Sequence, residues 1–173
     1  MESMERDNQT TRMIRLLLFL SLCSTVSAAP LTFERGAVYL THWEGYRLVP
    51  YRDAQSGWSV GVGHSLTAHR EQVKSRYTPA EVHAFLVHDF AVALESCEQG
   101  ITDFDELPLD VQEVCIGVAF GCGARGFERF KSFRWALSRR AYWVAANELG
   151  LSKWYHQVSP NRANEAIRVL RAY

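Results

Sequence analysis

Two carboxylates and a hydroxyl group lie close together in one short stretch of the sequence. Asp53 follows Glu44 by nine residues, and Ser59 follows Asp53 by six. Cleavage of a glycosidic bond needs a protonated acid that donates to the leaving oxygen. It also needs an ionised group that stabilises the oxocarbenium-like transition state or orients a water. Glu44 and Asp53 have this chemistry, although their spacing alone is weak evidence because acids at helix ends and in turns are common.

The elements that must position these residues are a helix and a small hairpin sheet. Apolar residues recur at a helical period from Phe33 onwards, and Gly45 is a stop signal, so we expect a helix that ends at Glu44. Residues 46–64 alternate apolar with polar side chains and contain three glycines and a proline. This pattern predicts short strands joined by tight turns.

The remainder of the chain carries the signals of several helices. Residues 78–81 read Thr-Pro-Ala-Glu, a capping box with proline at the first helical position, and an apolar face follows. Further helical patterns cover residues 111–118, 132–137, 142–149 and 160–173. We therefore predict a mostly helical α+β domain with a small N-terminal antiparallel sheet.

The first 28 residues have the pattern of a secretory signal peptide. Arg15 precedes an apolar run over residues 16–23, and small residues follow, so cleavage after Ala28 or Ala29 is expected. The run is shorter than the roughly 20 residues that span a membrane, and an uncleaved anchor is the alternative. Because the segment before Met13 is polar and acidic, translation from Met13 is a second alternative.

The composition of residues 29–173 is that of one globular domain, since the chain is 47% hydrophobic and 22% charged. The formal net charge is zero. Removal of residues 1–28 leaves it at zero, because three acids and three bases are lost together. This balance gives no global attraction for nucleic acid or an anionic membrane. We expect a monomer whose only contact with a membrane is transient, through the N-terminal signal.

Cysteine and histidine spacing predicts neither a metal site nor a cofactor. The six histidines accompany no close cysteine pairs and form no His-Glu-x-x-His motif. In an oxidising compartment, Cys97, Cys115 and Cys122 would allow one disulfide and one free thiol, and the sequence leaves their pairing open. The alternative is that all three are small buried apolar groups.

The stretch around the two carboxylates resembles the active-site signature of the phage-type lysozymes, or endolysins, of glycoside hydrolase family 24. The matching motifs are Glu44-Gly45, Tyr51-Arg52-Asp53 and Gly61-Val62-Gly63-His64. The similarity extends over residues 33–173, through Phe120, the glycine-rich turn before Phe127, Lys153-Trp154-Tyr155 and Pro160-Asn161-Arg162-Ala163. It implies a lysozyme-like fold, with the active-site cleft between the helical lobe and the sheet.

The resemblance also implies catalytic roles. Glu44 would donate a proton to the glycosidic oxygen, and Asp53 would hold or activate the attacking water. Ser59 matches a position where the family usually has threonine, whose hydroxyl orients the same water, so the hydroxyl is kept and a methyl group is lost. His64, between two glycines, is expected to fix the hairpin rather than to perform chemistry.

Substrate-binding residues are implied in the same way. Arg162 resembles the family arginine that lies beside the catalytic glutamate, and a surface helical arginine is the alternative. Phe120, Ser132 and Asn147 match family positions that contact the sugar, the last two with small insertions nearby. After Phe120 the family commonly has an amide side chain that reaches into the cleft. Here the residue is Gly121, so one substrate hydrogen bond is expected to be missing.

The function implied is hydrolysis of the β-1,4 bond between N-acetylmuramic acid and N-acetylglucosamine in bacterial peptidoglycan, leading to lysis and needing no cofactor. A lytic transglycosylase is an alternative that needs no second acid, so Asp53 and Ser59 argue against it. A catalytically silent peptidoglycan-binding protein on the same fold is another. The signal peptide places the enzyme in the periplasm or outside the cell. The sequence leaves open whether it is a phage endolysin or a bacterial secreted or effector muramidase.

Overall fold

The structure is a computed structural model that describes residues 29–53 and 57–173. The predicted signal peptide, with the alternative start at Met13, lies outside the described residues. None of the helices within the described ranges is long and apolar enough to cross a membrane.

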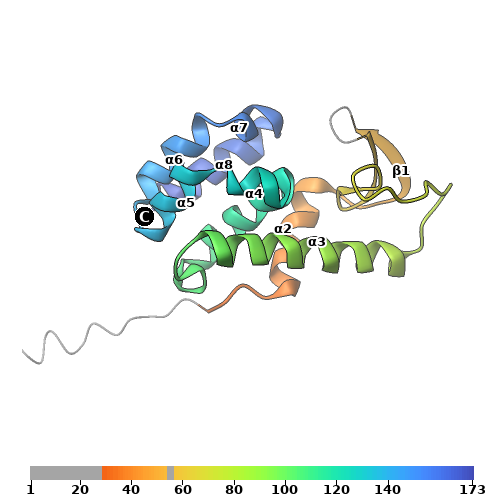
Figure 1. Ribbon diagram of the computed structural model, residues 1–173, viewed down its shortest axis with the longest axis horizontal. Helices are drawn as coiled ribbons and strands as arrows, with labels where there is room; N and C mark the ends of the chain where they lie inside the picture. Colours follow the sequence, from red (N-terminus) through yellow and green to blue (C-terminus); the bar gives the residue numbers. More distant parts are fainter. Residues whose placement is uncertain (1–28, 54–56) are drawn as a thin grey trace, which may run out of the picture.

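The chain folds into a small sheet and a larger group of helices (Figure 1). The strands are β1 (Arg47–Asp53), β2 (Gly57–Gly61) and β3 (His64–Ser65). The helices are α2 (Phe33–Glu44), α3 (Pro79–Gly100), the 3₁₀ helix η1 (Phe104–Glu106), α4 (Leu109–Glu128), α5 (Lys131–Ser138), α6 (Tyr142–Gly150), α7 (Lys153–Gln157) and α8 (Pro160–Leu170). The predicted mostly helical α+β fold is confirmed.

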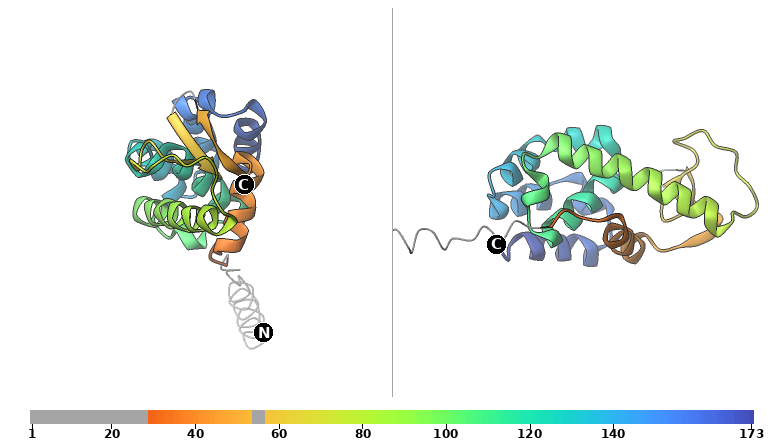
Figure 2. Two further views of the ribbon diagram at one scale, coloured as in Figure 1. Left: turned by 90° about the vertical axis from the view of Figure 1, so that its right-hand side faces the viewer. Right: turned by 90° about the horizontal axis from the view of Figure 1, so that it is seen from below.

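Two lobes can be distinguished, and α3 links them. The small lobe consists of β1–β3 and residues 66–78, and the helical lobe consists of α4–α8. Helix α3 runs from one lobe to the other, as the views along two directions show (Figures 1 and 2). The strands pair antiparallel in the order β1-β2-β3, with Ser59 opposite Tyr51 on one side and Ser65 on the other.

Local capping signals explain where the helices begin and end. The Thr78 side chain accepts a hydrogen bond from the Glu81 amide, and the Glu81 carboxylate accepts one from the Thr78 amide, so the predicted capping box is formed. Helix α2 ends at Glu44 as predicted, because Gly45 leaves the helix with a φ of 78°. The sequence patterns did not predict α7, a single short helix that Ser152 caps.

The helical lobe and the small lobe have separate apolar cores. The larger core surrounds α4, whose residues from Val114 to Ala119 are all buried. The small core contains four buried residues, Val60, Leu66, Tyr77 and Val82. The sheet lies close to α3, because a Cβ atom on Gly61 would come within 2.8 Å of the Val82 side chain.

The cysteines of the described chain are all free. Cys97 and Cys115 are buried in the larger core, where burial raises the pKa of both thiols, and Cys122 is partly exposed. The disulfide that an oxidising compartment would allow is not formed among these three residues. For Cys97 and Cys115, the structure agrees with the alternative that they act as small buried apolar groups.

Candidate active site

The carboxylate of Glu44 is fixed by an ion pair with Arg162. Glu44 is the last residue of α2, and its side chain remains partly exposed. Arg162, on the first turn of α8, donates from Nη1 to Oε1 of Glu44 and from Nη2 to the carbonyl oxygen of Gly117 at 3.0 Å. A guanidinium that bonds two groups in different elements holds the carboxylate in one place.

Arg162 is buried, with 5% of its surface exposed, so the alternative of a surface helical arginine is wrong. Its Cζ atom lies 5.6 Å from the centre of the Trp154 ring. Gly117 makes room on the other side, since a Cβ atom there would lie 2.8 Å from the Tyr39 ring and 3.4 Å from Nη2 of Arg162. This packing restricts the guanidinium to the position from which it reaches Glu44.

The second oxygen of Glu44 lies beside Gly63 and Phe120. A Cβ atom on Gly63 would be 3.5 Å from Oε2 of Glu44 and 3.5 Å from the Phe120 ring. Gly63 has a φ of 75°, a conformation that favours glycine. Arg162 therefore holds one carboxylate oxygen, while the other lies at the wall that Gly63 and Phe120 form.

A cleft of about 620 Å³ separates the small lobe from the helical lobe beside Glu44. Ser59 and Tyr51 line it from the sheet, and Phe120 and Arg162 line it from the helices. Ser59 is only 2% exposed, so its hydroxyl lies in the wall of the cleft rather than on an open surface. The fold brings Glu44, Ser59, Phe120 and Arg162 to one cavity.

Asp53 ends β1, and its backbone pairs with Gly57 in the register that places Tyr51 opposite Ser59. The hairpin predicted to carry Asp53 is therefore present. The position of the Asp53 carboxylate lies outside the part of the chain that the structure describes, and its role remains a prediction.

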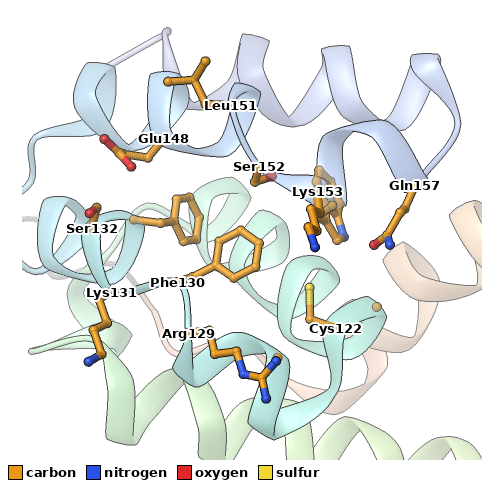
Figure 3. A pocket seen from close by; sticks show the side chains of 14 residues that line it. Cys122, Arg129, Phe130, Lys131, Ser132, Glu148, Leu151, Ser152, Lys153 and Gln157 are labelled. Atoms are coloured by element: carbon orange, nitrogen blue, oxygen red, sulfur yellow. The ribbon is translucent and has the colours of Figure 1, made fainter.

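A second pocket, of about 590 Å³, continues from the cleft along α5, α6 and α7 (Figure 3). The two cavities share Gly121, Cys122, Trp154 and Gln157 in their walls. Ser132 lines the second pocket, as do the exposed Lys131 and Arg129. This pocket extends the possible binding surface beyond Glu44 into the helical lobe.

Asn147 does not line either pocket. Its side-chain oxygen accepts a hydrogen bond from Arg171 at 3.3 Å, on an exposed part of α6. The next residue, Glu148, lines the second pocket instead (Figure 3). Neighbouring residues on a helix point about 100° apart, so a shift of one position in a weakly matched segment moves a side chain out of the pocket. Asn147 therefore lies outside both pockets, and its contact with substrate stays a prediction.

Gly121 is packed against the indole of Trp154. A Cβ atom on Gly121 would lie 3.1 Å from Nε1 of Trp154, so a side chain there would require the ring to shift by a few tenths of an ångström. Trp154 is 3% exposed, and its buried indole N–H has no hydrogen-bond partner among the described residues. Position 121 thus lacks the amide side chain that the family commonly has, and the Trp154 ring lies beside it.

His64 forms a buried polar cluster at the other wall of the cleft. Its Nδ1 lies 2.7 Å from a carboxylate oxygen of Asp89, and its Nε2 lies 3.3 Å from one of Glu71. Its ring stacks on Phe85 at a centroid distance of 4.2 Å. Burial alone would lower the pKa of His64, but the hydrogen bonds and charges of Asp89 and Glu71 outweigh it and raise that pKa.

The sequence predicted a structural role for His64, and its contacts link β3 to α3 and to residues 66–78. Sequence reasoning missed its two acidic partners. Asp89 is 25 residues away from His64, on the middle of α3, and no local pattern marks it. Only the packing of the sheet against α3 brings the two side chains together.

A glutamate at the end of a helix, in a cleft between a small sheet and a helical lobe, is the arrangement expected of a lysozyme. Comparison with known families agrees, because the phage lysozyme family profile matches residues 41–168. The chain therefore belongs to the phage lysozyme family.

Three relatives illustrate the range of the family. "Probable T4-type lysozyme 1" of Dictyostelium discoideum is 26% identical over 154 residues, which cover 76% of this chain and 90% of that protein. "Probable T4-type lysozyme 2" of the same organism is 25% identical over 153 residues, or 75% of this chain and 89% of that protein. "Peptidoglycan hydrolase gp36" of Pseudomonas phage phiKMV is 32% identical over 134 residues, or 75% of this chain but 14% of that much longer protein.

Proposed function

We propose that this lysozyme-family protein is an exported muramidase that hydrolyses the β-1,4 bond between N-acetylmuramic acid and N-acetylglucosamine in bacterial peptidoglycan. The observation that carries the proposal is the geometry of Glu44. Arg162 holds one carboxylate oxygen, and the other lies beside Gly63 and Phe120 in the wall of a cleft that the two lobes share. The name of the phage relative, a peptidoglycan hydrolase, supports the same substrate.

In the proposed reaction, Glu44 donates its proton to the glycosidic oxygen as the bond from that oxygen to the anomeric carbon breaks. A water attacks the anomeric carbon from the opposite face. Asp53 accepts a proton from this water, and the Ser59 hydroxyl orients it. Arg162 does not react; it keeps the Glu44 carboxyl directed at the leaving oxygen, which supports catalysis through positioning. The reaction needs no cofactor.

The first test is the substitution Glu44→Gln, with release of reducing ends from purified peptidoglycan as the measurement. An amide cannot act as a general acid, and general acid catalysis is typically worth about 100- to 10,000-fold in rate, so we expect a loss of that size. Glu34→Gln, an exposed position on the same helix, is the matched control and should retain activity. Equal lysis by Glu44→Gln and the parent would refute the assignment.

The second test concerns the stereochemistry of the product. If Asp53 activates a water, the first-formed product of a β-linked substrate is the α-anomer, which proton NMR detects before mutarotation. A β-anomer would make Asp53 a nucleophile. An anhydromuramyl end would identify a lytic transglycosylase, and binding without any product would identify a catalytically silent wall-binding protein.

Export is the remaining part of the proposal, and it depends on the sequence of residues 1–28 alone. Protein recovered from the periplasm or the medium should begin at Ala29 or Pro30 when its N-terminus is sequenced. An intact N-terminus in the membrane fraction would instead indicate an uncleaved anchor.

A further inference from the structure

Three possible metal ligands from separate segments meet at the small-lobe wall of the cleft. His64 lies on β3, His69 in the turn that follows it, and Asp89 on α3. One ligand atom from each residue can be chosen so that all three lie within 4.8 Å of one another. We propose that His64, His69 and Asp89 bind a divalent transition-metal ion such as Zn²⁺.

The distances fit a tetrahedral ion after small movements. Ligands bonded to zinc at 2.0–2.1 Å are about 3.4 Å apart in a tetrahedron. The two distances to Asp89 are each within about 0.7 Å of that spacing but reach different carboxylate oxygens. With one ligand atom from each residue the separations extend to 4.8 Å, so the His69 side chain must move toward the ion. Nδ1 of His64 lies 2.7 Å from Oδ2 of Asp89, and Nε2 of His69 lies 4.0 Å from Oδ1 of Asp89. The ion would take the place of the proton between His64 and Asp89 and separate those two atoms slightly.

His64 is already oriented, and His69 can move. His64 is stacked on Phe85, and its Nε2 faces Glu71 at 3.3 Å. A carboxylate on the far nitrogen of a ligating histidine is the usual device that fixes ring orientation and tautomer in zinc sites. The His69 side chain is 41% exposed, so its ring, now stacked on His64 at 4.6 Å, can turn toward the ion.

The charges and the accessibility of the cluster also suit a dication. Asp89 and Glu71 carry two negative charges beside two imidazoles that are neutral when they bind metal. His69 and Asp89 both line the cleft, which gives the ion a path of entry and leaves one coordination position for water. Because nitrogen ligands suit zinc, copper and nickel, whereas Mg²⁺ and Ca²⁺ prefer oxygen, the site should select the former group.

Such an ion would connect the turn after β3 directly to α3. The backbone of His69 is already held to β3, because its amide donates to the carbonyl oxygen of Ser65 at 3.2 Å. An ion bound by both His69 and Asp89 would therefore link this turn to α3 at the edge of the cleft. We expect zinc to raise the melting temperature of the protein.

The test is isothermal titration of the purified protein with ZnCl₂, compared with His69→Asn. One ion should bind the parent. Removal of one ligand should weaken zinc binding by at least about 10-fold, because the loss of a residue that only supports a metal ligand already costs about 10-fold in affinity or more. His69→Asn should keep the melting temperature of the metal-free parent, because the side chain is substantially exposed, and should lose the increase caused by zinc.

Two control variants separate this site from other zinc ligands. His156→Asn removes an exposed histidine on α7, and Cys122→Ser removes the partly exposed thiol; both should bind zinc as the parent does. Co²⁺ should give the visible spectrum of a tetrahedral site in the parent, and MgCl₂ should not compete. Equal zinc affinity in His69→Asn and the parent, loss of affinity in a control variant, or no binding to the parent would overturn the proposal.

Discussion

The two walls of the cleft are stabilised in different ways. On the helical side, the Glu44–Arg162 pair lies against a large apolar core that includes Phe127, Ile116 and Trp154. On the sheet side, Ser59 is supported by a core of four buried residues and by the polar cluster around His64. The acid thus lies beside the larger apolar core, whereas the residues proposed to handle water lie beside the smaller one.

The difference has a functional meaning. A small apolar core opens locally more easily than a large one, so changes in the small lobe should disturb Ser59 before they unfold the protein. Changes in the larger core should instead remove the fold and the activity together. Substitutions in each lobe test this contrast.

Phe127→Ala should destabilise the whole protein. Phe127 is 1% exposed and contacts the region of Gly100 at the end of α3. Loss of a buried phenylalanine typically costs about 3–5 kcal/mol of unfolding free energy. Urea denaturation should show one transition moved to lower concentration for fluorescence and circular dichroism alike, and a change below about 1 kcal/mol would contradict the assignment of this residue to the main core.

Leu66→Ala should act mainly on the small lobe. Leu66 is fully buried in the small core, and we expect a cost of about 2–3 kcal/mol, the lower part of the range for leucine, because a small cluster can collapse. Hydrogen exchange should accelerate more for amides of β2, β3 and residues 66–78 than for those of α4. Equal acceleration in both lobes would show that the lobes unfold as one unit.

Ser59→Ala should lower kcat by about 10- to 100-fold with little change in KM, because a hydroxyl that orients water acts mainly in the transition state. Ser59→Thr, which keeps the hydroxyl, is the matched control and should retain most of the turnover. The measurement is the rate of reducing-end release as a function of peptidoglycan concentration. A rise in KM alone would make Ser59 a binding residue rather than a residue that positions water.

Glu81→Gln should change the acid stability of the small lobe by a small amount. The hydrogen bond from Lys74 and those from Thr78 lower the pKa of Glu81 to about 2, from an ordinary value of 4.5. A lowered pKa stabilises the fold above pH 4.5, and this contribution is lost as the pH falls from 4.5 through 2. Urea denaturation at pH 5 and pH 2.5 should therefore show a smaller loss of stability for Glu81→Gln than for the parent, and equal losses would refute the role of this carboxylate.

The local sequence predicted the main elements and the type of chemistry. The stop signal at Gly45 placed Glu44 at the end of α2, the Thr78–Glu81 capping box marked the start of α3, and alternation over residues 46–64 predicted the hairpin. These features depend on backbone preferences and on contacts within a few residues. A local sequence pattern can therefore predict them. The resemblance to phage-type lysozymes then assigned roles along the chain.

Contacts between distant side chains depend on the packed fold. The resemblance implied that Arg162 lies beside Glu44, 118 residues away, and packing shows which atoms bond. No sequence pattern pointed to Asp89 and Glu71, which reach His64 from different segments. Packing also showed that Glu148 rather than Asn147 lines the second pocket. Such contacts depend on how helices and strands pack against one another, and a shift of one residue along a helix turns a side chain from a cavity toward solvent.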